Sequence, residues 1–146
     1  MLTRLIRDLF RPPARARGAA VDPGAAVLER AVKALHRAPE EAERLCREVL
    51  RDLPEHVEAR VTLGAAQLER GQSTAAVETL REALRAAPQH GEGQLLLGKA
   101  LRAVGDVDAA VLALQRAQRL IPERSDFWNE FGLLQLQLGK IGRAHV

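Results

Sequence analysis

The chain contains an internal repeat of 34 residues, and this period constrains the fold more than any other feature. Residues 57–90 align with residues 91–124 without a gap, and twelve of the 34 paired positions are identical. Composition alone would produce about three such matches. A repeat of this length predicts stacked copies of one supersecondary unit, each of which buries its apolar face against its neighbours.

Each block has the pattern of two antiparallel helices. Apolar residues recur at helical spacing over residues 61–68, and Gly71 then predicts the end of the first helix because glycine tolerates a left-handed backbone. Ser73 or Thr74 is the expected cap of a second helix, which Pro88 ends.

A set of small residues and helix breakers recurs in both blocks and forms a recognisable signature. Its members are Leu63-Gly64 and Leu97-Gly98, Gly71 and Gly105, Ala76 and Ala110, Ala83 and Ala117, and Pro88 and Pro122. This signature resembles that of the tetratricopeptide repeat, a helix-turn-helix unit of 34 residues. The resemblance implies an all-α fold, a right-handed superhelical solenoid of antiparallel helix pairs. Small residues such as Gly64 and Gly98 are expected where two helices cross closely.

The aromatic positions of the family signature are filled differently in this chain. Arg60 and Gln94 stand where Trp is typical, and Gln67 and Leu101 stand where Tyr is typical. We therefore expect less apolar area to be buried in each repeat than is usual in the family.

Counting in steps of 34 from the two matched blocks extends the pattern in both directions. Residues 23–56 are predicted to form a degenerate first repeat, with helices near residues 24–37 and 40–51. Pro39 suits a first helical turn there. Residues 125–146 are predicted to form an incomplete fourth repeat, in which Trp128 and Gly139 fall on signature positions.

The last helix of the fourth repeat is expected to lack a covering partner. We expect this to expose four of its apolar residues and to promote self-association. The four residues are Phe127, Phe131, Leu134 and Leu138.

Residues 141–146 can be encoded by ATC GGA AGA GCA CAC GTC, a sequencing-adapter sequence, so we interpret this tail as non-native and the chain as a fragment of a bacterial protein.

Basic charge is concentrated at the N-terminus. Residues 1–20 hold five Arg and one Asp, whereas the remainder holds 17 basic and 18 acidic residues. A repeat region this close to neutral argues against nucleic acid as a partner. Residues 1–22 are interpreted as a basic amphipathic helix followed by a linker, with the apolar stripe within residues 2–11.

Three roles for this N-terminal stripe stay open: docking on the first repeats or simple fraying, contact with a membrane surface, and a mitochondrial presequence. Arg4, Arg7 and Asp8 interrupt any apolar run, so a cleavable signal peptide is disfavoured. We expect a cytoplasmic protein.

No residue pattern in the chain predicts catalysis, a metal site or a cofactor. No zinc-protease, nucleophile-elbow, phosphate-loop or dinucleotide-binding motif occurs. His56 and His90 lie 34 residues apart, which reflects the repeat and not a metal pair. Cys46 falls on the repeat position of Leu80 and is interpreted as a core residue, so we expect no enzyme activity from these residues.

The family resemblance implies a concave groove lined by the first helix of each pair, which binds a peptide or a partner helix. Lys99 and Arg102 are possible anchors there for an acidic group. Members of the family that bind chaperone tails use a Lys and an Asn where Val27 and Ala31 stand, so that activity is not expected. The predicted groove residues are Glu58, Val61, Ala65, Leu68 and Glu69; Glu92, Leu95, Lys99, Arg102 and Ala103; and Asp126, Asn129, Leu133, Leu136 and Gln137.

Two functions are consistent with these sequence features. The first is a non-enzymatic scaffold that binds a protein or peptide partner in the groove. The alternative is the N-terminal substrate-docking region of a truncated bacterial glycosyltransferase or sulfotransferase, since similar arrays precede such domains. A long continuation of the reading frame with a catalytic motif would distinguish the second from the first.

Overall fold

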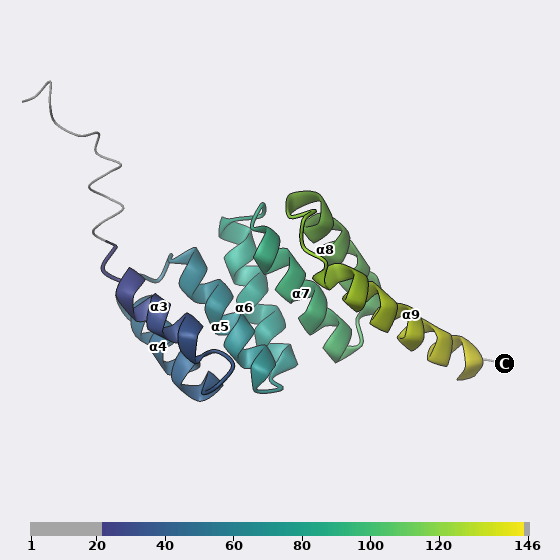
Figure 1. Ribbon diagram of the computed structural model, residues 1–146, viewed down its shortest axis with the longest axis horizontal. Coiled ribbons are helices and arrows are strands. Elements are labelled where there is room, and N and C mark those ends of the chain that lie inside the picture. The colour runs from purple at the N-terminus through teal and green to yellow at the C-terminus, as the bar shows by residue number, and fades with distance from the viewer. Residues whose placement is uncertain (1–21, 145–146) are drawn as a thin grey trace, which may run out of the picture.

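The computed structural model describes residues 22–144, which form α-helices and no strand. The helices stack in chain order, from α3 at one end of the molecule to α9 at the other (Figure 1). The predicted N-terminal stripe in residues 2–11 and the last two residues of the tail lie outside the described residues. The helices are α3 (Ala25–Ala34), α4 (Pro39–Asp52), α5 (Val57–Glu69), α6 (Ser73–Ala86), α7 (Gly91–Val104), α8 (Val107–Leu120) and α9 (Asp126–Ala144).

The packing order is that of a repeat solenoid. Every helix packs against the next one in the chain, and α3, α5, α7 and α9 also contact one another in sequence. These four helices therefore form one continuous layer, behind which α4, α6 and α8 form a second. The all-α solenoid that the family resemblance implied is confirmed.

Glycine ends the first helix of both matched blocks, as predicted. Gly71 has φ +73° and Gly105 has φ +90°, values that side-chain-bearing residues rarely adopt. The amide of Gln72 donates to the carbonyl of Gln67 at 2.8 Å, which closes the end of α5. The predicted cap at Ser73 or Thr74 is wrong: α6 begins at Ser73, and its N-cap Gln72 makes no side-chain capping bond.

Close helix crossing explains the glycine at position eight of each block. A Cβ atom at Gly64 would lie 2.6 Å from Cγ of Leu80, and one at Gly98 would lie 2.6 Å from Cδ2 of Leu114. Carbon atoms normally approach to about 3.5–4.0 Å. Each glycine therefore lets a buried leucine of the second helix sit directly on the backbone of the first.

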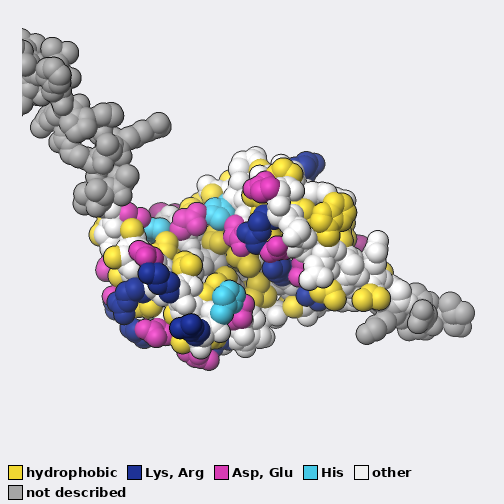
Figure 2. Space-filling model, viewed as in Figure 1, with side chains coloured by type: hydrophobic (Ala, Val, Ile, Leu, Met, Phe, Trp, Pro, Cys, Tyr) yellow, Lys and Arg dark blue, Asp and Glu magenta, His cyan; other side chains and the backbone are white. Residues whose placement is uncertain are grey.

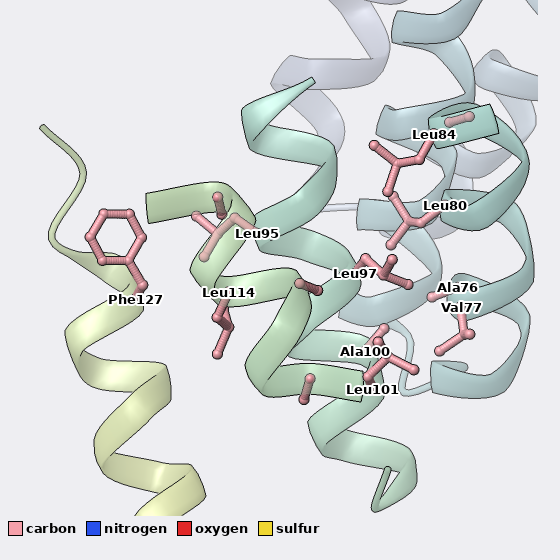
Figure 3. Close-up of a cluster of buried hydrophobic side chains, with 14 of the residues drawn as sticks. Ala76, Val77, Leu80, Leu84, Leu95, Leu97, Ala100, Leu101, Leu114 and Phe127 are labelled. Atoms are coloured by element: carbon pink, nitrogen blue, oxygen red, sulfur yellow. The ribbon is translucent and has the colours of Figure 1, made fainter. Parts of the chain in front are cut away.

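The core is almost wholly aliphatic and runs through the stack. Figure 3 shows the main cluster, in which leucines, alanines and Val77 from α6, α7 and α8 meet, with Phe127 at one edge. A smaller cluster joins Ala31, Leu45 and Cys46 of the first repeat to Leu63 of α5, so Cys46 is a core residue as its repeat position predicted.

Two positions that are aromatic in the family signature bury glutamine in this chain. Gln67 and Gln94 are both buried, and their side-chain oxygens have no hydrogen-bond partner among the described residues. The Gln94 amide nitrogen donates to the carbonyl of Pro88 at 3.1 Å. Each unpaired buried oxygen costs about 1–3 kcal/mol, so these substitutions lower the stability of the fold.

The last helix differs from the prediction. Gly139 falls on the turn position, but α9 continues through it to Ala144, because no second helix of the described residues folds back there and an unbroken helix keeps its backbone hydrogen bonds. Phe127 and Leu134 were predicted to be exposed, yet both are buried because they face α7 and α8. Phe131 is half-buried, and Leu138 is exposed as expected.

Candidate functional site

A hollow of about 530 Å³ opens on the layer formed by α3, α5, α7 and α9. Figure 2 shows this face, where hydrophobic side chains are visible in the middle of the stack among acidic, basic and histidine side chains. We call this hollow the groove. It is lined by Leu35, His36, Ala65, Leu68, Glu69, Ser73, Glu92, Leu96, Lys99, Arg102, Ala103, Arg124, Asp126 and Glu130.

Leucine and alanine side chains form the floor of the groove. Leu68 of α5 and Leu96 of α7 are half-buried, so each packs on the core and still presents a face to the hollow. Ala65 and Ala103 beside them are small, which leaves the hollow open. A floor of this kind favours the apolar side chains of a partner.

Ion pairs form the wall of the groove between α7 and α9. Arg102 Nε donates to Glu130 Oε2 at 2.7 Å, and Glu130 is buried. Arg124 donates to Glu92 Oε2 at 2.7 Å and to Asp126 Oδ2 at 2.6 Å. The hydrogen bond from Arg124 holds the pKa of Asp126 below its ordinary value. These contacts stabilise the position of α9 and shape one side of the groove.

The two predicted cationic anchors therefore have carboxylate partners of their own. Arg102 is held by Glu130, and Lys99 Nζ lies 3.9 Å from Asp126 Oδ2. The groove lining holds three cations and four carboxylates, which gives one net negative charge while His36 is neutral. This balance does not favour an acidic ligand.

The structure brings about half of the predicted groove residues together. Ala65, Leu68, Glu69, Glu92, Lys99, Arg102, Ala103 and Asp126 line the hollow. The others do not: Val61 and Leu95 are buried, and Glu58 pairs with His90. Asn129 lies between Asp126 and Glu130 but does not line the hollow, and Leu133, Leu136 and Gln137 lie further along α9.

Leu95 was predicted to line the groove, but its neighbour Leu96 does so instead. Leu95 is fully buried in the core beside Leu114 and Phe127 (Figure 3), while its neighbour Leu96 lines the groove. The layer packs on both sides of α7, so the leucine that faces the next repeat has no access to solvent. The lining residues that the sequence pattern did not indicate are Leu35, His36, Ser73, Leu96, Arg124 and Glu130.

The two junction histidines have the same structural role. Nδ1 of His56 accepts from the amide of Ala59 at 3.2 Å, and Nδ1 of His90 accepts from the amide of Gly93 at 2.9 Å. Each ring therefore caps the helix that follows it, in α5 and in α7. The 34-residue spacing of the histidines was the signal for this role.

The other nitrogen of each histidine ring lies against a carboxylate that is about one repeat length earlier in the chain. His56 Nε2 lies 3.1 Å from Asp22 Oδ2, and His90 Nε2 lies 2.6 Å from Glu58 Oε1. With Nδ1 accepting from the backbone, Nε2 carries the proton and donates to the carboxylate. This hydrogen bond lowers the pKa of Asp22. The Arg124–Glu92 pair occupies the same place at the next junction.

Neither a metal cluster nor a membrane span is found in the described part of the chain. Residues 22–144 contain no group of three or more His, Cys, Asp or Glu side chains that could hold a metal ion. Their helices include none that is long and apolar enough to cross a bilayer. Burial raises the pKa of the Cys46 thiol to about 12, which keeps it protonated and unreactive at neutral pH.

Comparison with protein-family models decides the family. The model described as tetratricopeptide repeat matches twice, over residues 34–100 and 68–130, which together cover most of the chain. The chain belongs to the tetratricopeptide repeat family. No curated protein sequence matches it.

Solved structures of the same family are similar to this one. The first tetratricopeptide domain of Spaghetti (RPAP3), bound to an HSP90 peptide, has a TM-score of 0.73 and 15% identity and covers 80% of this chain and 93% of its own. The protein TTC0263 of Thermus thermophilus has a TM-score of 0.71 and 25% identity, with coverages of 83% and 69%. An O-GlcNAc transferase of Thermobaculum terrenum has a TM-score of 0.65 and 31% identity; this chain aligns over 68% of its own length but only 19% of the transferase.

Proposed function

We propose that this tetratricopeptide repeat protein is a non-enzymatic interaction scaffold that binds a peptide or a partner helix in the groove. The observation that carries this proposal is the hollow of about 530 Å³ with an apolar floor at Leu68 and Leu96 and walls of paired charges. The array also resembles a domain whose structure contains a bound HSP90 peptide. A cytoplasmic location is part of this proposal.

The chemistry of the groove favours a partner with apolar side chains and no excess negative charge. Leucine and alanine side chains form the floor, and every cation of the lining lies within 4.0 Å of a carboxylate. An acidic ligand would have to displace an existing partner such as Glu130 before it could reach Arg102. Members of the family that bind the C-terminal tails of chaperones use a Lys and an Asn at the positions that Val27 and Ala31 occupy in this chain.

Selection of peptides tests the proposal directly. A random peptide library displayed on phage is selected on the wild-type chain, and the recovered peptides are measured by isothermal titration calorimetry. The variant Leu96→Gln removes one of the two leucines of the floor, and we expect it to weaken binding at least about tenfold. The control Leu112→Gln alters an exposed leucine of α8 outside the groove and should leave affinity within about twofold.

Two outcomes would contradict the proposal. One is the failure of the library to yield any peptide, and the other is an equal loss of affinity in the floor variant and the control. The acidic HSP90 peptide SRMEEVD, which the Spaghetti structure contains, serves as a charge control. We expect it to bind no better than a scrambled peptide.

A second candidate function is supported by the likeness to the transferase. The 31% identity to the Thermobaculum terrenum O-GlcNAc transferase favours a substrate-docking region that precedes a catalytic domain. Sequencing the gene past the codon for Gly139 tests this function and also tests the interpretation of residues 141–146 as adapter-derived. A continuation that encodes a transferase motif supports docking, whereas a stop codon soon after one further helix supports the free-standing scaffold.

A further inference from the structure

The second layer of the stack is open between α6 and α8. Each of these helices packs against α7, but they do not contact each other. Two adjoining hollows, of about 370 and 580 Å³, lie on this side of the molecule, and both are lined by Pro88, Gln94 and Arg116. We call the two hollows together the furrow.

The furrow is separate from the groove. Leu97 and Leu101 of α7 line the furrow, whereas Leu96 and Lys99 of the same helix line the groove. Successive residues of an α-helix are turned by about 100°, which places the two pairs on opposite sides of α7. A ligand in the furrow therefore does not compete with one in the groove.

The furrow combines an apolar floor with arginine side chains. Leu84 of α6 and Leu97 and Leu101 of α7 form the floor, and the two leucines of α7 point toward α6 (Figure 3). None of the described residues that line the furrow is acidic. Its four arginines are exposed, two on α6 and two on α8: Arg81, Arg85, Arg116 and Arg119.

The furrow arginines have no carboxylate partner among the described residues. The described arginines that lie within 4.0 Å of a carboxylate are Arg44, Arg47, Arg60, Arg70, Arg102 and Arg124. None of the four furrow arginines belongs to this set. The furrow differs in this respect from the groove, in which every cation already lies near a carboxylate.

The preceding junction of the repeat balances the same positions internally. There Arg60 Nη2 donates to the carbonyl of Pro54 at 2.6 Å, and Arg60 Nε lies 3.8 Å from Glu82 Oε2. In the next repeat, Gln94 stands at the position of Arg60 and Arg116 at the position of Glu82. Gln94 keeps the hydrogen bond to the proline carbonyl but carries no charge. The carboxylate of the earlier junction is thus replaced by an arginine that no described residue neutralises.

Charge and floor together select the occupant. Residues 1–20 hold five Arg and one Asp, so this segment of the chain has the same sign of charge as the furrow and is repelled. No aromatic side chain of the described residues lines the furrow, so the bases of a nucleic acid have nothing to stack on. Carboxylates pair well with arginine, and apolar side chains suit a leucine floor.

We propose that the furrow is a second binding surface, which binds an acidic peptide segment of a partner protein. The carboxylates of the segment pair with the four arginines, and its apolar side chains lie on the three leucines of the floor. This inference goes beyond the function proposed for the groove and does not depend on it.

Fluorescence anisotropy with designed peptides tests the proposal on the whole chain. We expect the labelled peptide EDLEELEDL to bind, and the neutral peptide QNLQQLQNL, which has nearly the same shape, to bind at least about tenfold more weakly. EDSEESEDS keeps the charge without the leucines and should also bind more weakly. Because the pairs lie at the surface, the affinity for EDLEELEDL should fall as salt is added.

Point variants locate the binding. Arg116→Glu reverses the charge at the position shared by the two hollows and should weaken binding of EDLEELEDL at least about tenfold. The matched control is Arg30→Glu, because Arg30 is an exposed arginine of α3 that has no described carboxylate within 4.0 Å and lies outside the furrow. It should leave affinity within about twofold. Leu96→Gln, which alters the groove floor, should have no effect, so failure in the groove and failure in the furrow are distinguished.

A double variant copies the preceding junction into the furrow. Gln94→Arg combined with Arg116→Glu places the Arg60–Glu82 arrangement one repeat further along, so the furrow would neutralise one of its own charges. We expect binding of EDLEELEDL to be lost while circular dichroism shows unchanged helical content.

Four results would overturn the proposal: no binding of the acidic peptide, equal binding of the neutral peptide, equal losses in Arg30→Glu and Arg116→Glu, or full affinity in a folded double variant. Duplex DNA and phosphatidylserine vesicles are measured alongside the peptide. Tighter binding of either one that requires Arg116 would assign the furrow to that partner and would also overturn the proposal.

Discussion

We expect the replacement of glycine by alanine at one register position to have opposite effects on stability in different repeats. In Gly98→Ala, the new methyl carbon would lie 2.6 Å from Cδ2 and 2.7 Å from Cγ of Leu114. This overlaps by about 1 Å with the normal carbon–carbon separation. Leu114 is fully buried, so the overlap must be relieved by displacing its side chain within the core or by shifting α8 away from α7.

The expected magnitude follows from two opposing terms. Overpacking a core with one methyl group costs up to about 3 kcal/mol. Alanine is favoured over glycine inside a helix by about 1 kcal/mol. We therefore expect Gly98→Ala, and equally Gly64→Ala against Leu80, to lower the free energy of unfolding by about 2 kcal/mol. Gly132→Ala meets nothing within 4 Å and should raise the free energy of unfolding by about 1 kcal/mol.

Urea denaturation followed by far-ultraviolet circular dichroism measures these differences. The experiment is repeated at several protein concentrations, so that any contribution from self-association is detected as a change in the transition midpoint. The slopes of the transitions must agree for the midpoints to be compared. The reasoning is refuted if Gly98→Ala is as stable as the wild-type chain, or if Gly132→Ala is destabilised as much as Gly98→Ala.

Three further predictions concern single polar side chains. Glu43 is 3% exposed and pairs with Arg47 and Arg70. Burial raises the pKa of Glu43, but the interactions with the two arginines lower it more. The ionised carboxylate therefore stabilises the fold above its ordinary pKa of 4.5, and this contribution is lost as pH falls through the lowered pKa. Glu43→Gln should cost about 2 kcal/mol at neutral pH and flatten the acid side of a stability–pH curve, whereas an unchanged curve would contradict the ion pairing. His90→Ala removes the cap of α7 and should cost about 1 kcal/mol by urea titration, a result that a neutral effect would refute. Cys46, whose pKa is raised to about 12 by burial, should react with a thiol reagent at mildly alkaline pH only as fast as the chain opens, so rapid labelling of the folded chain would show that the site is not closed.

The 34-residue period could be recognised in the sequence because each repeat contacts only its neighbours. Local signals are then sufficient to place the helices: Gly71 and Gly105 end them with a left-handed residue, and Pro39 begins α4. A glycine at the turn position does not end a helix by itself. Gly139 has the same register as Gly105, but α9 continues through it because no described second helix folds back against it.

The groove was harder to predict because exposure is decided by packing between helices. Periodicity places Leu95 and Leu96 on adjacent parts of one helix, and it cannot say which of them the next repeat will cover. The structure buries Leu95 beside Phe127 and leaves Leu96 in the groove. The burial of Phe127 and Leu134 has the same cause, since α7 and α8 cover the inner side of α9.

Ion pairs between repeats also depend on how the helices pack. Arg102 and Glu130 are separated by 28 residues, and Arg124 and Glu92 by 32. In sequence, Arg102 is only a possible anchor for a partner, because the pairing depends on how far α9 is displaced from α7. The repeat, the helix ends at Gly71 and Gly105 and the close helix crossings can be predicted from the sequence, because they depend on residues near one another in the chain. Which side chains remain free to bind a partner depends on the packing of the helices, because accessibility and charge pairing are set by distances between helices that no local pattern encodes.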